Sequence, residues 1–432
     1  MGRGCFLIVF LCAGLLCPPL PLNASTLTLS LKDVLEMGIE NSLDLQKNLI
    51  DLAGAEYSAN RLWSEVFPTI SGSLGASYEN RLLSGDGFDP NADGGRISAG
   101  LAINLTLNAG IPYAMRNIRL AYQTRLLNYE DARNQLEIQL TKNFYSLIAD
   151  NENLVVLADM LNLEQLQYER NRVAFNNGLI GELALMQSML GMENALFNLS
   201  AARSAYATRK GEFLARLGIS QDMDAVIEGK IEIVKVEADA EQLIREYLPR
   251  RPDIVSRRQE IDRLENAEKQ TSLSARAPSL SLSAQWRSSN FDPFTDSLSA
   301  SATVNIPIDP WIPGTGRNQS IRSARLAIDK ARLDLQSAED AAAIQIRSLA
   351  ANLRNSWDSI EIARLSLGVA ERGHELTEQG FRNGTVNFLT LEDARNNLTN
   401  ARQRLLQSEL SYLNMILDIS AALNISWKDL MQ

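Results

Sequence analysis

Residues 278–286 read Pro-Ser-Leu-Ser-Leu-Ser-Ala-Gln-Trp, and this stretch decides the class of fold. Apolar residues occupy every second position, with serine and glutamine between them. Successive side chains of a β-strand point to opposite faces, so the spacing predicts a strand with one apolar and one polar face. The polar face is small and uncharged, which favours a strand between lipid and a water-filled lumen. A half-buried strand of a soluble sheet is the alternative.

Three further segments alternate in the same way, so four strands are predicted, over residues 67–80, 98–108, 278–288 and 297–308. Each segment is about 10 residues long, which is the length of a tilted strand that spans a membrane. The connections Ser84 to Gly95 and Ser288 to Asp296 are rich in Gly, Asp, Asn and Ser. These connections are predicted to be exposed loops.

Long helices are predicted in the sequence on either side of the strands. In the last of them Leu391, Ala394, Leu398, Ala401 and Leu405 are three and four residues apart, the spacing of a left-handed coiled-coil seam. Continuous helices are expected from about residue 111 to 174 and from about residue 316 to 380. A helix of about 64 residues is about 96 Å long, so these helices predict a rod or a tube instead of a compact globule.

The chain contains the same plan twice. Phe175-Asn-Asn-Gly178 returns as Phe381-Arg-Asn-Gly384, 206 residues later (384 minus 178), and many flanking residues keep this offset. We expect a first repeat over residues 25–219 and a second over residues 239–432, separated by a linker at 220–238. Each repeat starts with a helical stretch (31–65 and 240–274), continues with two strands and ends in a helical hairpin. The hairpin turns are predicted near residues 175–182 and 381–388.

The first 24 residues resemble a secretory signal peptide. Arg3 precedes an apolar run from Phe6 to Leu16, prolines follow, and small residues near Ala24 suit cleavage. All three cysteines, Cys5, Cys12 and Cys17, lie in this leader, so a mature chain cut there has no thiol chemistry. Lipid attachment at Cys17 is the less favoured alternative. No later apolar stretch reaches about 18 residues, the minimum for a membrane-spanning helix.

Several functions are disfavoured by composition. A net charge of −10 argues against broad nucleic-acid binding. His374 is the only histidine, and no pair of acidic residues has the spacing of a catalytic acid and base, so neither an enzyme nor a metal or cofactor site is predicted. Gly314-Thr-Gly-Arg317 lacks the full phosphate-loop pattern and is interpreted as a strand-to-helix elbow.

Four strands per chain cannot close a barrel, because the smallest closed barrels have about eight. Open edges in lipid would leave backbone groups without partners, so several copies must share one barrel. Two copies would give a filled interior, and three would give twelve strands with room for a water-filled lumen. The predicted fold is therefore mainly α with a shared transmembrane β-barrel.

The order of motifs resembles that of the TolC-like outer membrane efflux protein family. Strand entries carry Phe67-Pro-Thr-Ile-Ser71 and Ala277-Pro-Ser-Leu-Ser281, and Phe-x-Asn-Gly precedes an apolar residue at both turns. Asn41-Ser-Leu43 and Arg251-Pro-Asp253 are similar to the family's opening-helix motif. The resemblance covers about residues 27–430, and each motif is weak alone.

The resemblance implies a homotrimer in the outer membrane, with a twelve-stranded barrel and a periplasmic helical tunnel. It also implies a belt near residues 220–236, a periplasmic adaptor protein and an inner-membrane pump as partners, and a tip that is closed at rest. The family's pore carboxylates match Asp393, while Thr390 departs from the pattern. Glu392 and Glu182 are further tip candidates, and Gly178 and Gly384 are expected to serve the turn backbone. An ordinary solvated role for Asp393 is the alternative.

Two functions follow as hypotheses. The first is a passive exit duct of a tripartite efflux or type I secretion system. The second is a soluble periplasmic coiled-coil scaffold in which the strands form a small sheet.

Overall fold

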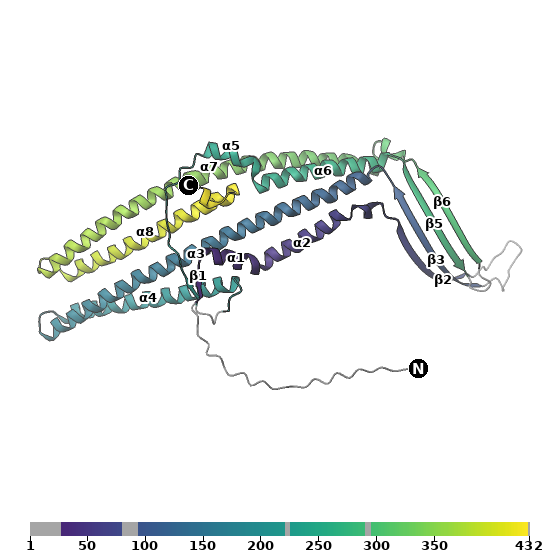
Figure 1. Cartoon of the computed structure of the whole chain (residues 1–432). Helices are drawn as coiled ribbons and strands as arrows, with labels where there is room; N and C mark the ends of the chain where they lie inside the picture. Colours follow the sequence, from purple (N-terminus) through teal and green to yellow (C-terminus); the bar gives the residue numbers. More distant parts are fainter. Residues whose placement is uncertain (1–26, 80–93, 221–224, 290–294, 431–432) are drawn as a thin grey trace, which may run out of the picture.

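The structure, a computed structural model, describes residues 27–79, 94–220, 225–289 and 295–430. The molecule is elongated, with long helices at one end and a β-sheet at the other (Figure 1). The predicted leader, most of the two strand-connecting loops and residues 221–224 of the linker lie outside the described residues. Among the described helices, none combines the length and the apolar character needed to cross a membrane.

Two helical hairpins form the long arm. The first consists of α3 (Ile111–Asn176) and α4 (Glu182–Arg216), and the second of α7 (Gly316–Arg382) and α8 (Phe388–Leu423). The long helices α3 and α7 have 66 and 67 residues, which corresponds to about 100 Å each. Their bounds lie within two residues of those expected from the heptads. Thr315 caps α7 by accepting a hydrogen bond from the Asn318 backbone at 3.4 Å, so residues 314–317 form an elbow.

The opening helical stretches, expected over residues 31–65 and 240–274, are each divided into shorter helices. The first is divided into α1 (Leu31–Asn41), α2 (Leu43–Asn60) and η1 (Leu62–Val66). The second is divided into α5 (Ala240–Tyr247), η2 (Leu248–Arg250) and α6 (Pro252–Arg276).

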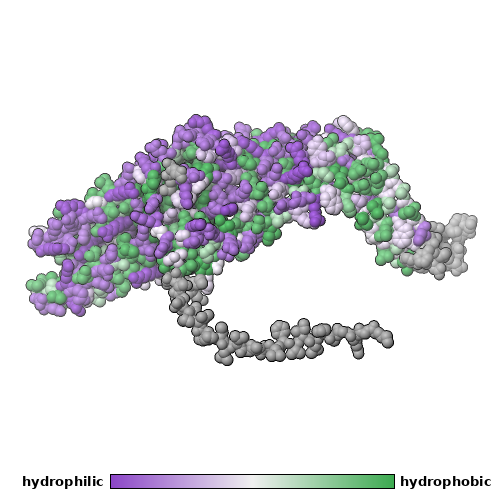
Figure 2. Space-filling view, viewed as in Figure 1, coloured by the Kyte–Doolittle hydropathy of each residue, from purple (hydrophilic) through white to green (hydrophobic). Residues whose placement is uncertain are grey.

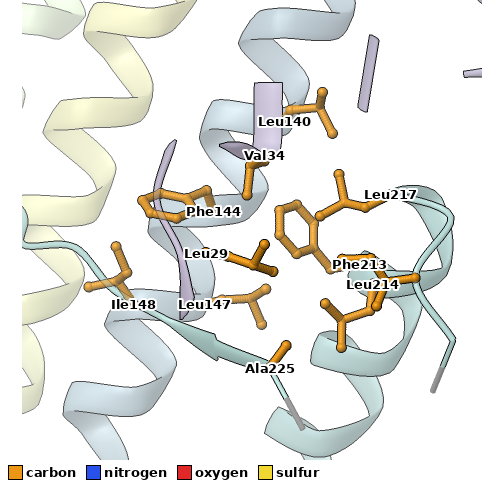
Figure 3. Close-up of a cluster of buried hydrophobic side chains, with 11 residues drawn as sticks. Leu29, Val34, Leu140, Phe144, Leu147, Ile148, Phe213, Leu214, Leu217 and Ala225 are labelled. Carbon is orange, nitrogen blue, oxygen red and sulfur yellow. The ribbon is translucent and has the colours of Figure 1, made fainter. Parts of the chain in front are cut away.

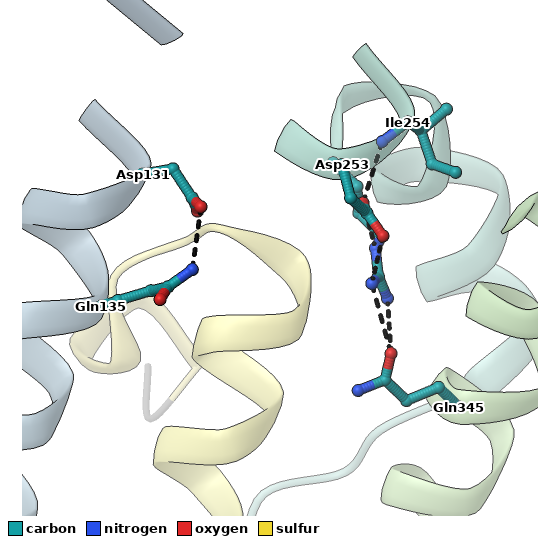
Figure 4. A network of polar contacts seen from close by, with 6 residues as sticks. Asp131, Gln135, Asp253, Ile254 and Gln345 are labelled. Atoms are coloured by element: carbon teal, nitrogen blue, oxygen red, sulfur yellow. Dashed lines mark hydrogen bonds and ion pairs between the residues drawn. The ribbon is translucent and has the colours of Figure 1, made fainter. Parts of the chain in front are cut away.

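Local chemistry causes both breaks. Ser42 is extended and its hydroxyl accepts a hydrogen bond from the Leu45 backbone, so it starts a new helix. Arg251 precedes Pro252, whose ring disfavours helical geometry at the residue before it. Arg251 then binds Asp253 through two hydrogen bonds of 3.0 and 2.9 Å and Gln345 of α7 at 3.2 Å (Figure 4). The Arg-Pro-Asp motif thereby fixes the start of α6 against α7.

Four strands form one antiparallel sheet in the order β2-β3-β5-β6. Their bounds are Thr69–Glu79, Gly94–Leu107, Ser279–Ser289 and Thr295–Asn305. Thr69 pairs with Asn104, and Ser279 pairs with Asn305, so the helix ends of all four strands lie together. The outer strands β2 and β6 each lack a neighbour on one side among the described strands.

The helices are also arranged in open rows. Towards the hairpin tips the row is α4-α3-α8-α7, and beside the sheet it is α2-α3-α6-α7. The edges are therefore α4 or α2 on one side and α7 on the other. The sheet has β2 on the side of α2 and β6 on the side of α7 (Figure 1). The molecule therefore has two open edges that run through both the sheet and the helices. One is formed by elements of the N-terminal half of the chain and the other by elements of the C-terminal half.

The best-packed part of the molecule is its waist. Parallel strands β1 (Leu27–Leu29) and β4 (Ala225–Ile227) lie there, and Phe144, Phe213 and Leu217 pack beside them (Figure 3). A second cluster surrounds Tyr412, which is fully buried. The Tyr412 hydroxyl donates to the Val234 carbonyl (3.1 Å) and accepts from the Val236 backbone (2.8 Å). These bonds fix the described part of the linker, residues 225–238, against α8.

Candidate functional site

The two faces of the sheet differ in polarity. Ile70 pairs with Ile103, Leu101 with Trp286, and Leu282 with Ala302, so the apolar positions of all four strands are in phase. Serine, threonine, asparagine and glutamine alternate with them, and Ser283 and Ser301 are hydrogen-bonded at 2.7 Å on that polar face. One face is therefore continuously apolar and the other is polar and wettable.

The apolar face is exposed and has the height of a membrane core. Leu74 is 85% exposed and Leu298 is 80% exposed, although both are large apolar side chains. On β3 the apolar positions extend from Ile97 to Leu107, about 34 Å along the strand and about 26 Å at a tilt of 40°. That height matches the apolar band of outer-membrane barrels, about 25 Å. In Figure 2 apolar colour gathers over this end, whereas polar colour dominates over the long helices.

The edge helices carry exposed apolar residues at intervals of seven. Leu43, Ile50 and Tyr57 form such a stripe on α2, and Leu183, Leu190 and Phe197 form one on α4. The opposite edge, α7, presents Leu326 and Leu333 beside the sheet and Ile362, Val369 and Leu376 near the tip. Nine of these eleven side chains are at least 61% exposed, and the other two, Tyr57 and Leu376, are 58% and 52% exposed. An interval of seven is the repeat of a coiled-coil seam, so both edges are suited to pack against further helices.

The hairpin tips are closed by two matching turns. Gly178 and Gly384 have φ angles of 72° and 75°, a left-handed backbone that glycine adopts without a steric cost. The Leu179 backbone donates to the Ala174 carbonyl at 2.8 Å, and the Thr385 backbone donates to the Gly380 carbonyl at 2.9 Å. Both turns are therefore Schellman motifs, which end α3 and α7 at the same relative place.

Thr390, one of the predicted tip residues, takes part in a helix cap. Its backbone N–H and its hydroxyl both donate to the Asn387 side-chain oxygen at 2.9 Å. Asn387 is the N-cap of α8. Thr390 is therefore bound within its own turn.

The acidic candidates lie apart. Asp393 is exposed on α8, and its charge contributes to a raised pKa at the neighbouring Glu392, for which burial is the larger cause. Glu182 is exposed in the first turn of α4, where the positive end of the helix dipole favours a carboxylate. Glu392 and Asp393 are therefore neighbours on α8 through the sequence alone, while Glu182 lies on another helix.

A buried ion pair between the hairpins is absent from the sequence-based candidates. Glu164 of α3 is 2% exposed and Arg395 of α8 is 5% exposed, and their nearest charged atoms, Oε1 and Nη1, are 3.8 Å apart. Both Glu164 oxygens and the Arg395 Nε and Nη1 atoms lack a hydrogen-bond partner among the described residues. The sequence contained a signal for the burial of Arg395, because this residue is four positions after Leu391 and three before Leu398, which are both buried on α8. The seam of α8 includes Arg395, while Ala394, expected there, is only half-buried.

Burial controls the ionisation of this cluster. The pKa of Glu164 is raised mainly by burial, an effect that the nearby Arg395 opposes. The pKa of the His374 imidazole is lowered, first by burial and then by the positive charge of Arg395. The pKa of Glu378 is lowered, chiefly because it accepts a hydrogen bond from Arg382. Around the buried Arg395 guanidinium, the pKa of one glutamate, Glu164, is therefore raised and that of another, Glu378, is lowered.

The contact between α3 and α8 changes character along its length. Near the waist Ile138 packs against Leu413 and Leu417. Towards the tip the partners are polar: the Gln403 amide donates to Asn153 at 2.9 Å, the Thr399 hydroxyl contacts the Met160 sulfur at 3.4 Å, and Arg395 faces Glu164. Apolar packing holds the hairpins at the waist, whereas polar contacts that water can replace hold them near the tip.

A polar groove of about 390 Å³ borders the ion pair. Glu164, Gly191 and Glu392 line it together with asparagines of α4 and α8. Gly191 lies inside α4, where glycine costs about 1 kcal/mol relative to alanine. A β-carbon at Gly191 would be 2.9 Å from Glu164 Oε2 and 3.2 Å from Glu392 Oε1. The glycine therefore leaves space for two carboxylates.

A Gly191→Ala substitution is expected to lower the stability of the seam by about 1 kcal/mol, because the new methyl group must displace the ends of the Glu164 and Glu392 side chains. Amide hydrogen exchange of residues 157–171 measures this loss. Gly54→Ala is the matched control, because a β-carbon at Gly54 of α2 meets nothing within 4 Å. Slower exchange in the seam of the Gly191→Ala protein would contradict the close approach.

Comparisons with known proteins agree with this architecture. Residues 243–424 match the sequence profile described as outer membrane efflux protein. No curated protein sequence is significantly similar to the chain. Within the described ranges no three histidine, cysteine or acidic side chains are placed to hold a metal ion.

Solved outer-membrane channels share the fold over nearly the whole chain. The Campylobacter jejuni CmeC outer membrane channel has 19% identity and a TM-score of 0.74, with 91% of this chain and 85% of that chain covered. CusC has 16% identity and a TM-score of 0.77, with 92% of each chain covered. The Neisseria gonorrhoeae MtrE outer membrane channel, in an open state, has 14% identity and a TM-score of 0.75, with 93% and 90% covered.

The resemblance is therefore confirmed: residues 243–424 carry the sequence pattern of the outer membrane efflux protein family, and the chain has the fold of outer-membrane channels.

Proposed function

We propose that the chain is one subunit of an outer-membrane channel, a passive exit duct through which a tripartite efflux or type I secretion system exports its cargo. The observation that carries the proposal is the in-phase separation of an exposed apolar face and a polar face on a sheet with two open edges. The apolar face contacts lipid, and the polar face lines water. The helices extend this duct into the periplasm.

Ring closure by identical copies satisfies both open edges at once. The strand directions alternate, so β6 of one copy can pair antiparallel with β2 of the next. The same rotation brings α7 of one copy against α2 and α4 of the next, where both sides carry apolar stripes at intervals of seven. Three copies give a barrel of twelve strands, wide enough for a water-filled lumen. We therefore propose a homotrimer, in which the similar element order of the two halves reflects an internal duplication.

The tip is proposed as the regulated end of the duct. Three copies of Asp393 would form a ring that favours cations, and Glu392 would lie beside it. The polar seam through Glu164 and Arg395 would allow the hairpins to part near the tip while the waist stays packed. A periplasmic adaptor protein joined to an inner-membrane pump is the proposed partner that opens the tip.

The soluble scaffold is the less favoured function. Such a protein would leave a sheet with a continuous apolar face in water, although large exposed apolar patches are rare on soluble monomers. Leu74 and Leu298 on that face are highly exposed, and the main contact between the sheet and a helical element joins β3 to η1 at the helix end of the sheet. An exit duct needs no catalytic group, and the members of the fold compared above are channels.

Planar-bilayer recording of the purified protein tests the proposal. We expect stable conducting steps, a preference for K⁺ over Cl⁻, and native masses of three chains. An Asp393→Asn variant is expected to keep its conductance steps and lose part of the cation preference, seen as a reversal potential closer to zero in a KCl gradient. Asp358→Asn, at an exposed site on α7, is the control. A monomer that stays dissolved without detergent and never conducts would refute the duct.

A further inference from the structure

Aromatic side chains gather at the helix end of the β2 edge. Trp63 and Phe67 precede β2, and each is 55% exposed. Their rings are in edge-to-face contact, with 5.2 Å between centroids and an interplanar angle of 77°. Arg61, in the same connection, lies over the Tyr57 ring at 4.2 Å. Two exposed rings in contact are not explained by core packing, because neither belongs to a buried cluster.

The β6 edge carries a second aromatic and arginine pair at the same end. Trp311 of η3 (Asp309–Trp311) follows β6 and is 65% exposed. The Arg276 guanidinium lies over its ring at 5.0 Å, and Arg276 Nε has no hydrogen-bond partner among the described residues. Asp309, the acid nearest to Trp311 in sequence, is bonded to Arg317 at 3.2 Å. Because Nε is buried, an anion would be bound by the terminal Nη groups of Arg276, for which no hydrogen bond is found among the described residues.

Ring closure would join these two clusters. Thr69 starts β2 and Asn305 ends β6, and both residues lie at the helix end of the sheet. When β6 of one copy pairs with β2 of the next, Trp311 and Arg276 come to the same level as Trp63 and Phe67 of the neighbour. Ile306 and Ile308 follow β6 and are exposed, so they lie between these aromatic residues and the apolar face of the sheet. The combined site is incomplete in a single copy.

We propose that this junction between copies binds the phosphate-bearing headgroup of a phospholipid. The inference rests on the proposed duct, because it needs the apolar face of the sheet to be in lipid. Guanidinium groups bind phosphate oxygens through paired hydrogen bonds, and stacking on an indole holds the guanidinium in place. Indole rings prefer the boundary between headgroups and acyl chains. The isoleucines beside them contact the first part of the acyl chains.

The five tryptophans of the chain permit a direct test. Trp286 lies on the apolar face near the far end of the sheet, Trp63 and Trp311 lie at the proposed junction, and Trp357 and Trp427 lie in the waist. Variants that keep one tryptophan and carry phenylalanine at the other four are reconstituted into nanodiscs with phospholipids brominated near the glycerol or near the chain end. We expect strong fluorescence quenching of Trp63 and Trp311 by the shallow bromine and little quenching of Trp357 and Trp427.

Trp286 separates the two ways in which the test can fail. If Trp286 is quenched by brominated lipid while Trp63 and Trp311 are not, the sheet is in the membrane and the headgroup junction is wrong. If no tryptophan is quenched, the sheet is outside lipid and the duct itself is refuted.

Native mass spectrometry tests the phosphate contact separately. Wild-type protein extracted from vesicles of phosphatidylglycerol and phosphatidylethanolamine is expected to retain up to three phospholipids per trimer. Arg276→Gln should reduce the retained lipid at least several-fold, whereas Arg354→Gln, at an exposed arginine on α7, should not. Unchanged retention in the Arg276→Gln protein, with its trimer intact, would overturn the assignment of the phosphate site.

Discussion

An Arg395→Met variant is expected to destabilise the contact between the two hairpins by about 3–5 kcal/mol. Arg395 is the charged group that faces the carboxylate of Glu164, which is 2% exposed. Removing one partner of a buried ion pair leaves an uncompensated charge, and that costs far more than an intact pair contributes. Because the waist is held by apolar packing, we expect the loss to appear near the tip as faster exchange of backbone amides around residues 160–171 and 391–402.

A second variant separates charge from shape. Glu164→Gln combined with Arg395→Met removes both charges, so most of the lost protection should return. Arg404→Met changes an exposed arginine of α8 and is the control for the loss of a positive charge on that helix. Equal exchange in Arg395→Met and Arg404→Met proteins would show that the ion pair contributes nothing to the seam.

The second large effect is expected at two adjacent residues of β6. Ala302 lies on the apolar face opposite Leu282, and Ser301 lies on the polar face opposite Ser283. Arginine at a lipid-facing site near the middle of a membrane costs about 2–4 kcal/mol, and in the proposed ring this cost applies to every copy. Ala302→Arg should therefore prevent stable insertion into the outer membrane.

Ser301→Arg should insert, because its side chain would enter the proposed water-filled lumen. The expected result is a lower single-channel conductance and a weaker cation preference. Membrane fractionation compares insertion, and bilayer recording compares conduction. If both arginine variants insert equally well, the polarity of the sheet does not decide its orientation towards lipid.

Much of this architecture is readable from local patterns. The alternation in residues 278–286 places a strand there because a strand has a side-chain period of two, and β5 (Ser279–Ser289) occupies that place. The long helices follow from heptads that extend over many turns, and the hairpin turns follow from Asn-Gly pairs. The breaks at Ser42 and before Pro252 also have local signals, a helix-capping serine and a proline, although only helical stretches were predicted there.

The buried pair at the tip was harder to predict. Glu164 and Arg395 are separated by 231 residues (395 minus 164), and a charged residue in a helix is normally on the solvated face. The sequence-based candidates Asp393 and Glu392 are neighbours of Arg395, so the region was identified without its buried partner. Gly191 was overlooked for the same reason, since only the approach of α3 and α8 explains a glycine inside α4.

The sequence by itself determined the period of each segment and the order of the segments, because these depend on residues close together in the chain. Only the tertiary structure decided that all four strands are in phase, that β2 with α4 and β6 with α7 form two matching open edges, and that Glu164 meets Arg395. Those features depend on register between distant segments. A shift of one residue in a strand would exchange its apolar and polar faces without changing any local pattern.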